Sequence, residues 1–96
     1  MKVYLTAIIK SKPGSAETMK PLITALVDAS NKETGCEQYE LFHSTEDENI
    51  FILHETWQNQ EILDTHNKAE SINTFISAAG AILDGSIIVY KTQKGI

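Results

Sequence analysis

The sequence predicts a single α+β domain over residues 1–96, with the element order β-α-β-β-α-β and a four-stranded antiparallel sheet that carries its helices on one face. Four short runs of apolar and β-branched residues alternate with polar, turn-forming segments, which is typical of strands. Two longer segments repeat apolar residues at the spacing of one helix face. The length of 96 residues suffices for one hydrophobic core and therefore for one domain.

The first strand and the first helix are predicted at residues 3–10 and 15–32. The strand is almost continuously apolar or β-branched, and the Lys-Pro-Gly sequence at 12–14 ends it. Ser15 is expected to cap the helix, and Gly35 is the left-handed residue expected after its C-terminal end. The apolar stripe of this helix consists of Met19, Leu22, Ile23, Leu26, Val27 and Ser30.

Residues 36–44 and 50–57 are predicted to form an antiparallel hairpin, because a polar turn at 45–49 joins two strand-like segments. Along a strand, successive side chains point to opposite faces of the sheet. Strict alternation in the first of these two strands therefore places on one face Cys36, Gln38, Glu40 and Phe42.

The second helical region and the last strand complete the order. Asn59 is expected to cap a helix, the apolar pattern pauses at residues 67–70, and Ser71 is expected to cap a second helical segment. Residues 87–90 form the last apolar run, after an Asp-Gly turn. The whole order is the ferredoxin-like arrangement.

The face of the sheet opposite the helices is expected to be apolar, because the strands do not place polar residues at every second position. An uncovered apolar patch of this size usually marks a partner surface. We therefore predict a homodimer in which two sheets pack face to face under twofold symmetry, with the helices outside.

Charge and composition argue against several other partners and cofactors. With 8 Lys+Arg, 13 Asp+Glu and a net charge of -5, the chain has no basic cluster for nucleic acid. It has no apolar run of bilayer length and no leader sequence, and its one cysteine, Cys36, suits a cytoplasmic protein without membrane association. A Gly-rich phosphate loop and a metal-ligand cluster are absent, so neither an organic cofactor nor a metal is expected.

The strand at residues 50–57 carries the most unusual pattern in the chain. Alternation places Glu55 on the same face as three large apolar residues, Phe51, Leu53 and Trp57. An ionised carboxylate in such surroundings costs several kcal/mol unless it has a partner. The helix that follows carries His66 on its apolar stripe, which must fold back onto the sheet. We therefore expect Glu55, Trp57 and His66 to line one pocket.

The order and spacing of several motifs resemble the antibiotic biosynthesis monooxygenase family, which belongs to the dimeric α/β-barrel superfamily. The resemblance runs over roughly residues 3–90. The motifs are Lys12-Pro13-Gly14, Thr34-Gly35-Cys36 followed by Tyr39 and Leu41, Glu55-Thr56-Trp57, and His66 followed by Phe75. The resemblance implies a small cytoplasmic dimer with a pocket between sheet and helices. It also implies cofactor-independent oxidation of quinols or phenols by O₂, although some relatives are isomerases of small sugar-like signalling molecules.

Cofactor-free oxygenation needs a base, because a phenolate gives an electron to O₂ more readily than the phenol does. It also needs an apolar pocket and a hydrogen-bond donor for the carbonyl that forms. Our hypothesis takes His66 as the base and Glu55 as the residue that orients it. Trp57 and Phe75 would form the wall that binds the aromatic ring, and Tyr39 would contribute to substrate binding.

The sequence also allows two other functions for the chain, and purely structural roles for some of the residues singled out above. The same base would serve an isomerase by moving a proton between adjacent carbons, and the fold would also suit a dimeric binding module without turnover. His66 can be a buried, hydrogen-bonded histidine, Trp57 a core aromatic, and Cys36 a small buried hydrophobe.

Overall fold

The structure, a computed structural model, describes residues 1–95 and confirms the ferredoxin-like fold. The strands β1 (Val3–Lys10), β2 (Cys36–His43), β3 (Ile50–Trp57) and β4 (Ile88–Thr92) form one open sheet in the order β2-β3-β1-β4, and every neighbouring pair is antiparallel. The strands β2 and β4 are its two edges.

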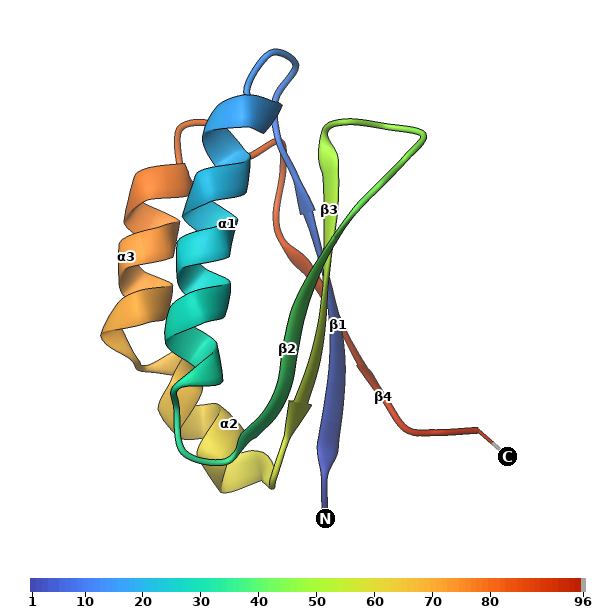
Figure 1. Cartoon of the computed structure of the whole chain (residues 1–96), viewed down its shortest axis with the longest axis vertical. Helices are drawn as coiled ribbons and strands as arrows, with labels where there is room; N and C mark the ends of the chain where they lie inside the picture. Colours follow the sequence, from blue (N-terminus) through green and yellow to red (C-terminus); the bar gives the residue numbers. More distant parts are fainter. Residues whose placement is uncertain (96) are drawn as a thin grey trace.

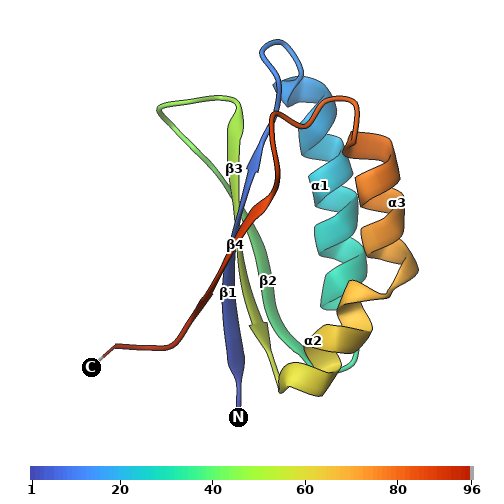
Figure 2. The ribbon, with the colours of Figure 1, turned by 180° about the vertical axis from the view of Figure 1, so that it is seen from behind.

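Three helices cover one face of this sheet and leave the other face uncovered (Figures 1 and 2). Their bounds are α1 (Ala16–Asn31), α2 (Gln60–Asn67) and α3 (Glu70–Ala79). The pause predicted at residues 67–70 is the junction between α2 and α3. The two longer helices, α1 and α3, lie side by side, while α2 lies near the end of the sheet where β3 ends.

The hydrophobic core fills the space between the inner face of the sheet and the helices. Alternate residues of β1 and β3 point into it, as the strand period requires, and the predicted stripe of α1 meets them. Its largest fully buried apolar side chains are those of Ile9, Met19, Ile23, Phe51, Leu53 and Trp57. This packing places the end of β3 directly beneath α2, which is where the candidate site forms.

Of the three predicted helix caps, Asn59 is confirmed, Ser15 is confirmed in position but not in its side-chain bond, and Ser71 is wrong. The Asn59 side chain accepts a hydrogen bond from the Ile62 backbone N–H at 2.9 Å. Ser15 occupies the cap position of α1 but makes no capping bond with its side chain, and its backbone carbonyl accepts from the first turn instead. Ser71 lies inside α3, because that helix begins after Ala69.

A β-bulge near the start of β2 overturns the alternation predicted for this strand. Cys36 pairs with Trp57 and Gln38 pairs with Thr56, so that Glu37 is an extra residue without a counterpart on β3. One extra residue shifts the side-chain alternation by one position. Cys36 therefore lies on the helix side of the sheet, and the prediction that it shares a face with Gln38 was wrong.

Large apolar side chains remain exposed on the uncovered face, among them Phe42, Ile88 and Tyr90, each about half exposed. Ile8 and Ile52, which are paired at the centre of the sheet, point to the same face and are partly exposed. Within residues 1–95, no helix has both the length and the apolar character required to cross a membrane.

Candidate active site

A cavity of about 660 Å³ lies between the inner face of the sheet and the helices α2 and α3. Its volume is within the range of roughly 300–1,000 Å³ that is typical of small-molecule sites. The walls are mostly apolar, with leucine and isoleucine side chains from both layers and the ring of Phe75. The polar and charged side chains that reach it are Tyr39, Glu55, Gln60, His66, Asn67 and Lys91.

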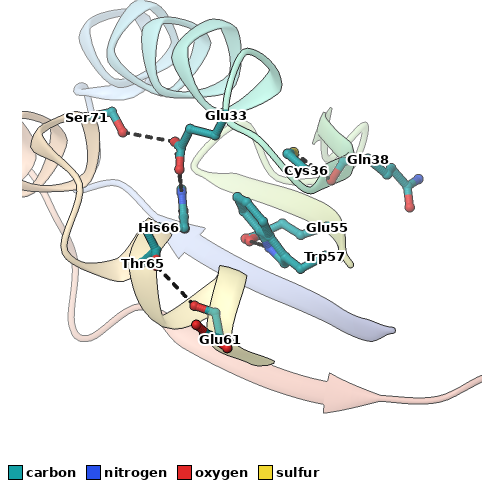
Figure 3. Close-up of polar contacts among 9 residues, drawn as sticks. All are labelled: Glu33, Cys36, Gln38, Glu55, Trp57, Glu61, Thr65, His66 and Ser71. Carbon is teal, nitrogen blue, oxygen red and sulfur yellow. Dashed lines mark hydrogen bonds and ion pairs between the residues drawn. The ribbon is translucent and has the colours of Figure 1, made fainter. Parts of the chain in front are cut away.

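His66 lies in the last turn of α2 and is only 2% exposed. Its Nδ1 atom is 2.9 Å from Glu33 Oε1 and 3.0 Å from Oε2, so that both carboxylate oxygens face the same ring nitrogen (Figure 3). An ionised carboxylate can only accept hydrogen bonds, which requires that Nδ1 carries the proton. In the neutral imidazole, Nε2 is then free to act as a proton acceptor.

Glu33 is a part of the site that the sequence reasoning missed. It follows α1 in the connection to β2 and is partly buried, with 24% of its side chain exposed. Besides His66, it accepts a hydrogen bond of 3.4 Å from Ser71 Oγ of α3. A negative charge just past the C-terminal end of a helix is unfavourable next to the helix dipole. That misplaced charge was the one signal in the sequence that Glu33 needs a partner elsewhere.

Glu55 has a partner, as predicted, but the partner is not His66. Trp57 Nε1 donates a hydrogen bond of 2.9 Å to Glu55 Oε1. The two residues are two positions apart on β3, so they share a face and lie within reach of each other. Burial raises the pKa of Glu55 above its ordinary value, an effect that the Trp57 hydrogen bond and the nearby His66 oppose. The expected orienting role of Glu55 toward His66 falls instead to Glu33.

Two aromatic rings, those of Trp57 and Tyr39, pack against the imidazole of His66. The Trp57 ring lies 4.3 Å from it between centroids with a tilt of 35°, and the Tyr39 ring lies 5.6 Å away. Tyr39 and Trp57 contact each other edge to face at 6.0 Å. These contacts leave His66 little freedom to rotate away from Glu33.

Four of the five predicted site residues line the cavity, and the fifth lies behind it. Tyr39, Glu55, His66 and Phe75 reach the cavity wall. Trp57 is fully buried and does not line the cavity. Its ring packs against the imidazole of His66, and its Nε1 atom donates to Glu55 (Figure 3). Trp57 therefore does not form the ring-binding wall of the hypothesis and instead has the alternative role of a core aromatic.

The pKa values of two further groups, the buried hydroxyl of Tyr39 and the partly buried thiol of Cys36, are raised above their ordinary values. Burial, followed by the charge of Glu55, raises the pKa of Tyr39 well above its usual range, although the Ser30 hydroxyl opposes the shift, so the Tyr39 hydroxyl keeps its proton. Burial and the charges of Glu33 and Glu55 raise the pKa of the Cys36 thiol to about 11, which argues against a nucleophilic role. Among residues 1–95, no group of three or more His, Cys, Asp or Glu side chains is arranged to hold a metal ion.

The sequence of this chain matches one protein-family model and is similar to that of a bacterial relative. The family model described as "Antibiotic biosynthesis monooxygenase" matches residues 3–78. YcnE of Bacillus subtilis (strain 168), whose name describes it provisionally as a monooxygenase, is 30% identical over 91 residues, which is 95% of this chain and 96% of YcnE.

Solved structures with the same fold include PA3566 from Pseudomonas aeruginosa and Rv0793 from Mycobacterium tuberculosis. PA3566 has a TM-score of 0.92 and 28% identity, with 99% of this chain and 95% of PA3566 covered. Rv0793 has a TM-score of 0.90 and 20% identity, with 100% of this chain and 97% of Rv0793 covered, and shows the fold alone.

Proposed function

Because the chain belongs to the antibiotic biosynthesis monooxygenase family, we propose that it is a monooxygenase that oxidises a phenolic or quinol-type small molecule with O₂, with the substrate itself supplying the electrons. One observation carries the proposal: His66 lies at the wall of a largely apolar cavity with its Nδ1 atom held by a carboxylate. A histidine held in this way is a suitable general base near neutral pH.

In the proposed reaction, a phenol with a free ring C–H loses its hydroxyl proton to His66 Nε2. The phenolate transfers one electron to O₂, and the two radicals combine at the ring carbon. Loss of the ring proton and cleavage of the O–O bond leave one oxygen atom as a new carbonyl and the other as water. In total, four electrons pass from the ring to O₂. The hydroxyl proton, which His66 returns, and the proton from the ring C–H both end in the water molecule.

Each side chain of the site has a distinct part in this scheme. The Glu33 carboxylate stabilises the imidazolium that forms when His66 takes the proton, as a charge-assisted hydrogen bond does. The protonated Tyr39 hydroxyl donates to the oxygen that becomes negative. The apolar walls, including Phe75, keep water away from the radical pair. Trp57 fixes the positions of His66 and Glu55.

The test is an oxygen-electrode assay over a panel of phenols and quinols at neutral pH, with no added cofactor and with spontaneous autoxidation subtracted. Wild type is expected to consume O₂ faster than buffer, and His66→Ala is expected to lose at least about 10²-fold, the lower end of general-base contributions. His43→Ala is the matched control, because His43 stacks on Phe51 and does not line the cavity. Equal rates for wild type, His66→Ala and buffer would reject the oxygenase and leave isomerisation or binding.

We also propose that two chains pair through the uncovered sheet face and so form the dimeric α/β barrel. The support is the exposed apolar side chains of that face, which include Phe42, Ile88 and Tyr90. A contiguous apolar surface of this kind is normally buried against a partner. A second copy of the chain offers the same surface and would bury both under twofold symmetry.

A further inference from the structure

Among the residues that the structure describes, Lys91 is the one lysine that lines the cavity. It lies on β4, at the exposed mouth of the cavity, and its side chain points toward the N-terminal end of α2, where its Nζ atom donates a hydrogen bond to Gln60 Oε1. That partner is a neutral amide. Among residues 1–95, Lys2 and Lys10 have carboxylates within 4.0 Å, whereas Lys91 has none. Its charge is therefore not neutralised by a neighbouring side chain.

The pairing of the strands determines how far the backbone of Lys91 lies from that of Glu55. Leu5 of β1 pairs with Glu55 on one side and with Lys91 on the other, and Glu55 pairs in turn with Tyr39. These four residues form one row across the inner face of the sheet. Since neighbouring strands are about 4.8 Å apart, Lys91 begins roughly 10 Å from Glu55 along the row.

The wall of the cavity that α2 forms gives a similar distance between its two polar ends. Gln60, which accepts the Lys91 hydrogen bond, and His66 both lie on α2 and both line the cavity. They are six residues apart, which corresponds to about 9 Å along a helix. Between them the walls are apolar, with Leu63 on the helix and Leu5 on the sheet. The cavity therefore has a base at one end, a cation at the other, and room for a flat apolar body between them.

We propose that the substrate of this site is a phenolic two-ring molecule that carries a carboxylate or an equivalent oxyanion, and that Lys91 is the residue that selects for this anion. The inference rests on the proposed function, because it takes His66 as the end at which the phenolic hydroxyl binds. On substrate binding, the Lys91 ammonium exchanges its hydrogen bond to Gln60 for a charge-assisted one to the oxyanion. A lysine suits this role, since its flexible stem lets the ammonium turn inward.

The anion also has an electrostatic reason to need Lys91. The chain has a net charge of -5, and Glu33 and Glu55 lie close to the base. An anionic ligand therefore enters against a negative field unless a cation at the entrance compensates. Without Lys91, the site is expected to lose its preference for the anion over a neutral ligand of the same shape.

The test is calorimetric titration at pH 7 with two matched probes, 6-hydroxy-2-naphthoate and the corresponding neutral carboxamide, under argon so that no turnover occurs. Wild type is expected to bind the naphthoate about tenfold more tightly than the carboxamide, the size of one hydrogen bond to a charged group. Lys91→Gln is expected to remove this preference, and Lys91→Arg to keep most of it. Lys94→Gln is the control for net charge, because Lys94 is exposed and does not line the cavity.

Three results would overturn the proposal: equal binding of both probes to wild type, an unchanged preference in Lys91→Gln, or no binding of either probe at millimolar concentration. An equal loss of preference in Lys94→Gln would likewise overturn it, since the effect would then belong to the overall charge. The titration involves no oxygen, so its failure leaves the oxygen-electrode result standing, and a negative oxygen assay leaves the binding preference standing.

Discussion

At the level of single residues, the Glu33–His66 pair is the feature on which the proposed chemistry depends. Glu33→Gln keeps a side-chain oxygen that can accept from His66 Nδ1 but removes the negative charge. We expect the rate of O₂ consumption to fall at least tenfold, because the imidazolium loses its counter-charge, while the melting temperature changes little.

The control for this variant is Glu61→Gln, which makes the same charge change on the exposed side of α2 and does not touch the cavity. Wild-type activity in Glu33→Gln would show that the carboxylate contributes no charge stabilisation. An equal loss in both variants would point to a general electrostatic effect.

The buried carboxyl of Glu55 predicts a specific dependence of stability on pH. Because its pKa is raised in the folded state from an ordinary value of 4.5, the folded chain keeps this proton at pH values at which the unfolded chain has lost it. The free energy of unfolding should therefore fall as pH rises from about 4.5 to the folded pKa and then stay level. Glu55→Gln, which still accepts from Trp57 Nε1, lacks this contribution.

Urea unfolding of both proteins between pH 5 and pH 8 measures the difference directly. The stability of Glu55→Gln relative to wild type should increase with pH over this interval. A difference that stays constant, or that shifts in favour of wild type as pH rises, would contradict a raised pKa for Glu55.

At the level of elements, the position of α2 depends on the close approach of its Ile62 side chain to the backbone of Gly35. This residue has φ +82°, and a Cβ atom added there would lie 2.6 Å from Cγ2 of Ile62 on α2. We expect Gly35→Ala to destabilise the protein by about 2–5 kcal/mol, as the sum of left-handed backbone strain and overpacking. Because α2 also carries His66, the substitution should lower activity as well.

Gly85→Ala separates the two contributions in the same urea measurement. Gly85 has φ +81°, but no atom lies within 4 Å of its added Cβ, so only the backbone strain of about 1–2 kcal/mol remains. If both variants lose the same stability, the contact between Gly35 and Ile62 does not determine how α2 packs.

At the level of the whole molecule, the open sheet predicts self-association. Light scattering at micromolar concentration is expected to give about twice the chain mass of 10.7 kDa. Ile52→Lys places a charge at the centre of the uncovered face and should produce a monomer, because burying an unpaired charge is costly. Thr24→Lys on the exposed side of α1 is the control and should remain dimeric. A wild-type protein that stays monomeric would refute the barrel.

The sequence alone determined the features that depend on local periodicity and local hydrogen bonding. The alternation of β3 placed Glu55 beside Phe51 and Leu53, and this face is the one that the helices cover. The side chain of Asn59 began α2 where predicted. Such features were readable because the residues that produce them are at most a few positions apart, so the backbone period fixes their relation.

The tertiary structure alone decided which polar groups meet. Glu33 and His66 are 33 positions apart, and only the packing of α2 against the connection between α1 and β2 brings them together. The bulge at Glu37 reversed the face of Cys36, and the placement of β1 between β3 and β4 put Lys91 in line with Glu55. These pairings depend on how elements that are distant in sequence pack and register against one another, and no local period in the chain encodes that geometry.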